Sequence, residues 1–212
     1  MAGTGAQSQR TNRRGDATRE SLLEAALKAL ASGDPGAVSA NRIAKQIGAT
    51  WGVVKYQFGD ADGLWAAVLH RTAEHRADVF VSANATAPLR QRVAAIIEIL
   101  YDGLTATDSR AIENLRAALP RDPAELERLY PRTSAELQSW GRGWLATCQN
   151  AFADLNVDPE RVREVATFIP GAMRGITSER QLGSYYDLDL ARQGLTSAIV
   201  AYLEPSGPER PA

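Results

Sequence analysis

One segment of twenty residues constrains the fold of this chain more than any other. It runs from Ser39 to Phe58 and reads SANRIAKQIGATWGVVKYQF. Ile43, Ala44 and Ile47 recur at the spacing of three and four residues that places side chains on one face of a helix. Gly48 follows at once, and glycine commonly ends helices because it enters the left-handed conformation without a Cβ clash. The segment therefore predicts two short helices joined by a tight turn.

Two short helices joined by three or four residues that include a glycine form the DNA-binding helix-turn-helix pattern, in which the second helix lies in the major groove. Ser39 and Thr50 stand where the N-caps of the two helices are expected. Val54 is expected to face inward, and Phe58 to close the unit. A helical hairpin inside a protein core would show similar spacing, so the spacing by itself leaves both interpretations open.

The particular residues of this segment, beyond their spacing, resemble those of a known protein family. The run GATWGVVKYQFGD, from Gly48 to Asp60, resembles the turn and recognition helix of the TetR family of transcriptional regulators, which read Gly-Val-Ser-x-x-x-Leu-Tyr-Tyr-His-Phe-x-Ser/Asp. The preceding Ile43-Ala44 pair and the upstream helix expected over residues 18–31 are similar to the family as well. The resemblance covers residues 16–76, and beyond them only length and helical character agree.

The resemblance implies an all-α fold, with an N-terminal three-helix helix-turn-helix DNA-binding domain and a C-terminal helical ligand-binding and dimerisation domain. It implies a homodimer that represses genes until a small molecule binds. Four positions depart from the family pattern: Lys55 replaces an aromatic residue, Gln57 a histidine, Ala61 a lysine that contacts phosphate, and Arg42 a residue that is more often acidic. The sequence of the DNA operator therefore cannot be transferred from a relative.

The candidate DNA contacts lie on or beside the second short helix. They are Arg42, Thr50, Trp51, Val53, Lys55 and Tyr56. Lys55 can donate to guanine or to a phosphate, and Val53 can touch a thymine methyl group. Tyr56 matches the family tyrosine that binds a phosphate, a contact that sets register rather than sequence. For Trp51, stacking on DNA and packing on the neighbouring helix remain equally open.

Charge is distributed unevenly along the chain. Residues 1–58 hold eight Lys or Arg and four Asp or Glu, whereas the whole chain has a net charge of −1. A basic N-terminal module on an acidic body suits phosphate binding at one end. Chance fluctuation explains a net charge of +4 over such a length about as well.

We expect four regions. Residues 1–15 form a disordered basic arm, which either reaches the minor groove or acts as a solubilising tail. Residues 16–76 form the helix-turn-helix domain, with the motif itself at 39–58. Residues 77–204 form the helical ligand-binding and dimerisation domain, and residues 205–212 a flexible tail. Prolines predict a division at Pro131 and a kink at Pro170.

The expected ligand-binding region, residues 77–204, contains the candidate ligand contacts, of which Trp140, Trp144 and Cys148 recur at helical spacing. The candidate contacts are Tyr101, Trp140, Trp144, Cys148, Phe168 and Met173. Aromatic side chains beside Gly141 and Gly143 can enclose a pocket for a largely apolar or aromatic effector. The same pattern also fits plain core. By resemblance to the family, the homodimer interface is expected on the last two long helices, over residues 159–180 and 189–203.

Other classes of protein find little support. No apolar run approaches the length of a membrane helix, and the N-terminus lacks the apolar segment of a signal peptide, so a cytoplasmic protein is expected. A set of His70, Glu74 and Asp78 is more typical of a solvated helix face than of a metal site. We predict no metal, no cofactor and no catalytic residue, since the common enzyme motifs are missing. Two alternatives remain: a helical DNA-binding regulator without an inducer, and a helical enzyme or carrier with an accidental resemblance.

Overall fold

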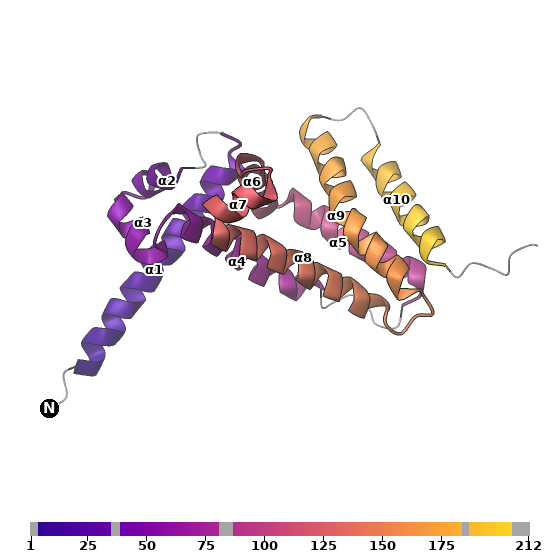
Figure 1. The fold of residues 1–212 in the computed structure, drawn as a ribbon, viewed down its shortest axis with the longest axis horizontal. Helices are drawn as coiled ribbons and strands as arrows, with labels where there is room; N and C mark the ends of the chain where they lie inside the picture. The colour runs from indigo at the N-terminus through magenta and orange to yellow at the C-terminus, as the bar shows by residue number, and fades with distance from the viewer. Residues whose placement is uncertain (1–3, 35–38, 81–86, 184–186, 205–212) are drawn as a thin grey trace, which may run out of the picture. The chain divides into compact units, whose positions relative to one another are not determined.

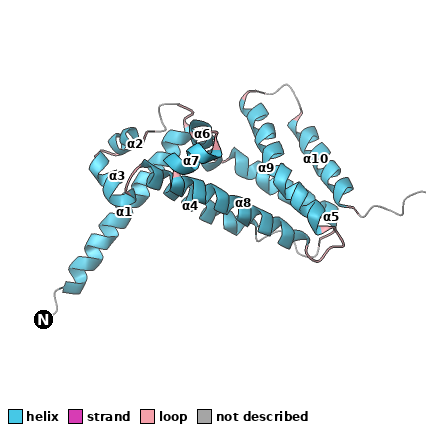
Figure 2. Ribbon diagram, viewed as in Figure 1, coloured by secondary structure: helices cyan, strands magenta, loops and turns pink. Residues whose placement is uncertain are grey.

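The computed structural model describes residues 4–34, 39–80, 87–183 and 187–204. Every regular element in these ranges is an α-helix, as Figures 1 and 2 show, so the all-α prediction is confirmed. The helices are α1 (Thr4–Ala31), α2 (Ala40–Gln46), α3 (Trp51–Phe58), α4 (Ala61–Phe80), α5 (Leu89–Thr105), α6 (Thr107–Ala118), α7 (Pro123–Leu129), α8 (Pro131–Phe152), α9 (Pro159–Gln181) and α10 (Leu188–Leu203). Within the described ranges, no helix is both long and apolar enough to cross a bilayer.

The chain divides into two compact units. The first comprises residues 1–74 and 106–138, and the second comprises residues 75–105 and 139–212. The first unit therefore differs from the expected domain of residues 16–76, because the chain returns to it with α6, α7 and the start of α8. The hydrophobic pattern of the sequence could not predict that these helices join the first unit. Apolar periodicity shows that one face of a helix is buried, but not against which partner.

The first unit is built around the apolar face of α1. Leu22, Ala26 and Leu30 are buried at helical spacing and pack against α6, whose Ala111 and Leu115 are also buried. Helices α2 and α3 pack on α1 as well. This face of α1 positions the predicted helix-turn-helix.

Helix α1 begins earlier than the sequence analysis predicted. The expected irregular arm over residues 1–15 is corrected from Thr4 onward, where the chain is already helical. Residues 4–16 contain no proline, and their Gln and Arg residues are good helix formers. Extending a helix that is already packed adds one hydrogen bond for each residue fixed, without the cost of nucleation. Residues 1–3 and the expected tail at 205–212 lie outside the described residues.

The second unit has its own apolar core, to which α5, α8, α9 and α10 contribute. Its buried side chains include Val93, Ile97, Phe152, Val165, Ile169, Ile199 and Leu203. Arg92 of α5 is also buried. Its guanidinium donates to both carboxylate oxygens of Asp154 and to the carbonyl oxygens of Ala87 and Ala151, so every side of the charge has an acceptor. A buried cation is tolerated under these conditions because it is both paired and hydrogen-bonded.

Helix boundaries in this part of the chain follow proline and aspartate. Helix α7 ends at Leu129 and α8 begins at Pro131, so the predicted division is confirmed. Asp158 caps α9 by accepting from the N–H of Glu160 at 2.9 Å, and Pro159 occupies the first turn, where its missing N–H has no helical acceptor. Pro170 lies inside α9.

Gly63 provides a test of the packing in the first unit. A Cβ placed on this residue would lie 2.0 Å from the carbonyl oxygen of Phe58 and 2.5 Å from Nη1 of Arg132. We therefore expect Gly63→Ala to lower the free energy of unfolding by about 2 kcal/mol or more, although alanine favours helices. Thermal and urea unfolding measure this change.

The control for this substitution is Gly141→Ala in α8, where a Cβ would meet no atom within 4 Å. Alanine is expected to raise the free energy of unfolding there by about 0.5–1 kcal/mol, since it costs less backbone entropy than glycine in a helix. A Gly63→Ala protein that is at least as stable as the wild type would contradict the packing described for Gly63.

Candidate nucleic-acid interface

Helices α2 and α3 are joined by residues 47–50, which make the sharp turn expected of a helix-turn-helix. Gly48 has a φ of +69°, in the left-handed region that a side chain would disfavour, so the glycine ends α2 as predicted. The Ser39 hydroxyl accepts from the N–H of Arg42 at 3.5 Å and caps α2. Thr50 occupies the N-cap position of α3, but its side chain makes no capping hydrogen bond.

Helix α3 buries one face and exposes the other. Val54 and Phe58 are buried, whereas Lys55 is exposed and Tyr56 is 86% exposed. The side chains with a cationic or hydroxyl donor therefore point to solvent, where a DNA groove or phosphate can meet them. A helix in the middle of a core would bury such side chains, so the alternative of an internal hairpin does not fit.

The remaining candidates on α3 lie at the margin of this exposed face. Trp51 is 38% exposed, so its indole is neither fully packed nor free, and Val53 is half-buried. Thr50 is exposed at the helix N-terminus. The structure brings five of the predicted residues together on one short helix and its cap.

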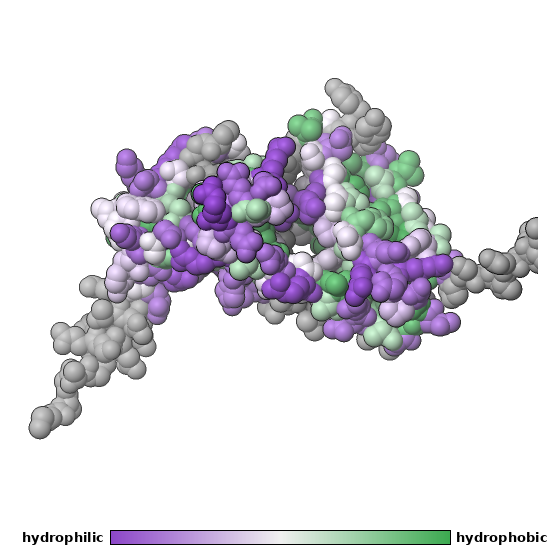
Figure 3. All heavy atoms as spheres, in the orientation of Figure 1, coloured by the Kyte–Doolittle hydropathy of each residue, from purple (hydrophilic) through white to green (hydrophobic). Residues whose placement is uncertain are grey.

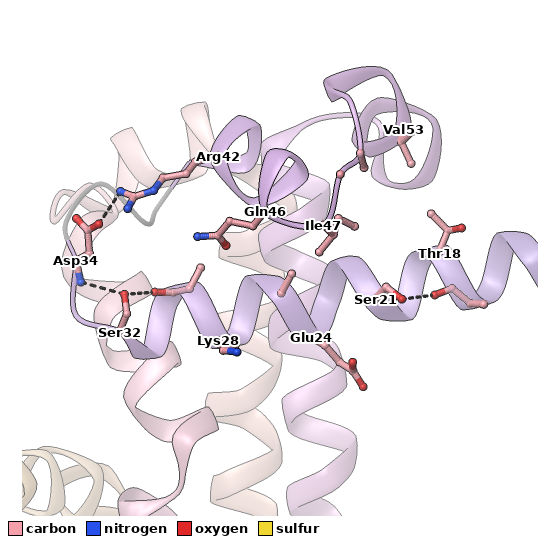
Figure 4. Close-up of a pocket in the computed structure, with 15 residues that line it drawn as sticks. Thr18, Ser21, Glu24, Lys28, Ser32, Asp34, Arg42, Gln46, Ile47 and Val53 are labelled. Atoms are coloured by element: carbon pink, nitrogen blue, oxygen red, sulfur yellow. Dashed lines mark hydrogen bonds and ion pairs between the residues drawn. The ribbon is translucent and has the colours of Figure 1, made fainter.

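Arg42 is placed differently from the other candidates. Its Nη1 lies 2.6 Å from Oδ2 of Asp34, three residues beyond the end of α1, and Figure 4 shows the side chain extending toward this carboxylate. The pair lies along a groove between α1 and the α2–α3 segment, with Val53 lining the opposite end. No sequence signal indicates Asp34 as a partner, because residues 35–38 separate it from α2 and show no helical spacing.

Two arginines far from α3 in sequence bind its C-terminal end. Arg19 of α1 donates to the carbonyl oxygen of Gln57 at 2.8 Å and stacks over the Phe58 ring at 4.4 Å from the centroid. Arg132 of α8 donates to the carbonyl oxygen of Phe58 at 3.0 Å. These oxygens have no partner within the helix. Cations near a helix C-terminus are also favoured by the helix dipole.

The candidate ligand contacts lie in the second unit and differ in how far they are buried. Cys148 and Met173 are buried in its core, and Tyr101 and Trp144 pack against that core. The Trp144 indole N–H donates to the carbonyl oxygen of Ala166 at 2.7 Å, which joins α8 to α9. Phe168 is 44% exposed, so its predicted place beside the other residues is corrected.

Helix geometry explains why Phe168 is exposed while its neighbours on α9 are buried. Residues Ile169 and Met173 of α9 are four apart and buried, and Phe168 precedes the first of them by about 100° of helix rotation. Trp140 is half-buried on α8. Tyr101 carries the guanidinium of Arg192 over its ring at 4.1 Å and that of Arg180 at 5.5 Å, an arrangement that spacing along one helix could not indicate.

No group of three His, Cys, Asp or Glu residues able to hold a metal is present among the described side chains. His70 lies 3.5 Å from Glu74 and 3.5 Å from Glu136 of α8, a contact that the sequence did not indicate. The side chain of Asp78, which was considered with them, is outside the described part.

Several solved structures share this arrangement of helices. A TetR-family transcriptional regulator from Streptomyces coelicolor superposes with a TM-score of 0.67, at 20% identity over 88% of this chain and 80% of its own. The multidrug-binding protein EbrR, solved with imidazole, gives a TM-score of 0.62 at 20% identity, over 91% and 98% of the two chains. NalD of Pseudomonas aeruginosa, described as the secondary repressor of the MexAB-OprM multidrug efflux pump, gives 0.63 at 18% identity, over 89% and 98%.

The chain has the fold of the TetR-family regulators. No family model and no curated protein sequence matches it, so this likeness rests on structure. Helices α2 and α3, with the turn at residues 47–50 between them, lie within the segment 39–58 in which the sequence predicts the helix-turn-helix.

Cys148 tests whether the aromatic cluster is open or closed. Burial raises the pKa of its thiol to about 12, so the thiol stays protonated at pH 8. We expect a disulfide reagent to label native Cys148 at least about 100-fold more slowly than the unfolded chain, because the thiolate is the reactive form. Absorbance of the released thiol measures the rate.

A variant with Cys148→Ala and Gln149→Cys moves the thiol one residue along α8 to an exposed position and should be labelled rapidly in the native state. Rapid labelling of native Cys148 itself would show an open cavity at this point rather than close packing.

Proposed function

We propose that this chain is a DNA-binding transcriptional regulator that acts as a homodimer in the cytoplasm. The observation that carries this proposal is the two-sided character of α3, which buries Val54 and Phe58 and presents Lys55 and Tyr56 to solvent within a TetR fold. Duplex DNA is the partner whose major groove accepts a helix and whose phosphates accept from cations and hydroxyls.

The exposed side chains have separate roles in this proposal. Lys55 donates to guanine O6 or N7, or to a phosphate, and Tyr56 and Thr50 donate their hydroxyls to phosphates. Val53 contacts a thymine methyl group, and the half-exposed Trp51 borders the same surface. Arg42 reaches a phosphate only if the phosphate replaces Asp34 as its anionic partner.

Helices α9 and α10 have an exposed face suited to a second copy of the chain. On α9, Phe168 is exposed together with Gly171 and Gly175, at intervals of three and four residues. On α10, Leu190 is 65% exposed and shares a face with Gly194, Ala198 and Tyr202. Figure 3 shows apolar side chains over these two helices.

Small residues let two helices approach closely, and a contiguous exposed apolar patch is typical of an interface. Closed two-fold symmetry would then present two copies of α3 to successive major grooves, about 34–36 Å apart, and require a pseudo-palindromic operator.

Regulation by a small apolar or aromatic effector is the first form of this function. It is supported by Trp144 and Tyr101, which are half-buried and pack against the core that contains Cys148 and Met173. Trp140 is half-buried on the same helix as Trp144. EbrR is described as binding multiple drugs and NalD as a repressor of an efflux pump. By analogy, effector binding would release the DNA and repression would end.

A regulator without an inducer is the second form. The hydrogen bond from the Trp144 indole to the carbonyl oxygen of Ala166 favours it, since a ligand between α8 and α9 at this point would have to break that bond. Release of bound DNA by a small apolar compound, accompanied by a higher melting temperature of the protein, would favour the first form.

Selection of bound fragments from a random DNA pool tests the proposed function and supplies the operator. With that fragment, we expect Lys55→Ala to weaken binding by about 1–3 kcal/mol if the lysine reads a base. If it contacts only phosphate, the loss should be equal for all sequences, with a shallower dependence on salt. Tyr56→Phe should weaken binding without changing sequence preference. Fluorescence anisotropy at several salt concentrations measures these effects.

Lys28→Ala is the matched control, because it removes the same charge from an exposed position on α1. Equal losses for Lys28→Ala and Lys55→Ala would indicate an effect of net charge alone. Unchanged binding in both Lys55→Ala and Tyr56→Phe would remove α3 from the interface.

Ala198→Arg tests the dimer. A long charged side chain in the middle of the exposed α10 face should separate the two copies and lower operator affinity at least about tenfold, since each protomer then binds one half-site alone. Light scattering after size-exclusion chromatography gives the mass. Ala153→Arg, at an exposed position between α8 and α9, should leave the mass and the affinity unchanged. A wild-type protein that remains monomeric at micromolar concentration contradicts this interface.

A further inference from the structure

The junction between α3 and α4 is bound by a side chain from a distant part of the chain. Arg132, the second residue of α8, donates through Nη1 to the carbonyl oxygen of Phe58 at 3.0 Å and through Nε to Asp62 at 3.3 Å. Its Nη2 also donates to Asp60. One guanidinium therefore contacts the last residue of α3, the turn that follows it and the first turn of α4.

The main chain of α8 makes a second set of contacts at the same place. The N–H groups of Arg132 and Thr133 each donate to the carboxylate of Asp62 at 2.9 Å, and the Thr133 hydroxyl donates to it at 2.7 Å. Asp62 is buried, and burial opposes its ionisation. The hydrogen bonds from Thr133 and Arg132 outweigh that effect and hold the pKa of Asp62 below its usual value. The carboxylate is thus ionised at neutral pH and fastens α4 to the first turn of α8.

Two glycines lie beside the guanidinium, and one of them, Gly63, leaves the space that it occupies. A Cβ on Gly59 would lie 3.5 Å from Nη1 of Arg132, and a Cβ on Gly63 would lie 2.5 Å from it. Gly59 also has a φ of +85°, which disfavours any side chain. The guanidinium consequently lies closer to the backbone at Gly63 than a side chain at that position would allow, whereas at Gly59 the positive φ is what favours glycine.

We propose that Arg132 is a positioning residue for DNA recognition: by bridging Phe58, Asp60 and Asp62 it fixes the angle at which α3 leaves the body of the first unit. The proposal rests on the DNA-binding function inferred above. A planar guanidinium with five donors can bind three acceptors in fixed directions, whereas a lysine ammonium cannot reproduce that geometry. Helix α3 has only eight residues, so the orientation of its two turns depends on what holds its ends.

Arg132→Gln is the test, with Arg128→Gln as its matched control. Arg128 lies on α7 of the same unit, is exposed, and its closest carboxylate is Glu125 at 3.9 Å. Both substitutions remove one positive charge. We expect Arg132→Gln to weaken binding of the selected operator at least about fivefold relative to Arg128→Gln, with the same affinity as the control for unrelated DNA. Arg132→Lys should behave like Arg132→Gln, since charge without the planar fork does not rebuild the bridge.

Amide hydrogen exchange of the protein without DNA measures local opening at the α3–α4 junction separately from the stability of the whole protein. The N–H of Gly63 donates to Asp60 at 2.9 Å and that of Gly59 to the carbonyl oxygen of Lys55 at 2.9 Å. We expect both amides to exchange faster in Arg132→Gln, while the amides of α1 keep their rates. If Arg132→Gln does not fold, Asp60→Asn removes one contact from an exposed position and is measured in the same two assays.

Three results would overturn the proposal. One is operator binding by Arg132→Gln equal to that of Arg128→Gln. Another is an equal loss for operator and unrelated DNA, which would show only an electrostatic contribution. The third is full recovery by Arg132→Lys. A wild-type protein that selects no DNA sequence would refute the proposed function itself, and is distinguished from these three results because it precedes any comparison of variants.

Discussion

The candidate nucleic-acid interface depends on one constraint: a helix of eight residues does not persist in water without tertiary contacts. Helix α3 therefore depends on Val54 and Phe58, its two buried residues, and on the helices against which they pack. Because the inner face is fixed in this way, the outer face with Lys55 and Tyr56 is fixed too. The long α1, with its buried leucine stripe, is the element that makes this possible.

Polar groups at helix ends also depend on tertiary contacts, because their hydrogen-bond partners come from segments distant in sequence. The last carbonyl oxygens of α3 accept from Arg19 and Arg132, and the end of α1 accepts from the amide of Asn114 at 2.7 Å. In the second unit, Arg92 satisfies carbonyl oxygens before α5 and at the end of α8. Buried or half-buried polar groups left without partners would cost free energy, so these side chains determine how tightly neighbouring elements are joined.

Helix α8 contributes to both units, its first turn to the α3–α4 junction and its later residues to the second core. The effector and positioning proposals therefore concern different parts of one helix. A ligand that favours one position of a helix over another changes a population rather than creating a new state. The size of any effect on DNA is then limited by the difference in ligand affinity between the two states.

The sequence by itself determined the helical class, the turn at Gly48, the inward side of α3 and the helix starts at Pro131 and Pro159, because these depend on residues a few positions apart. It did not determine the helical start at Thr4, where a polar composition with almost nothing to bury suggested an irregular arm, or the exposed position of Phe168. Only the tertiary structure decided that residues 106–138 join the first unit, that Asp34 binds Arg42, and that Arg132 binds the exit of α3. The physical reason is that periodicity records which side of a helix is buried, whereas partners from distant segments are chosen by the packing of the whole chain.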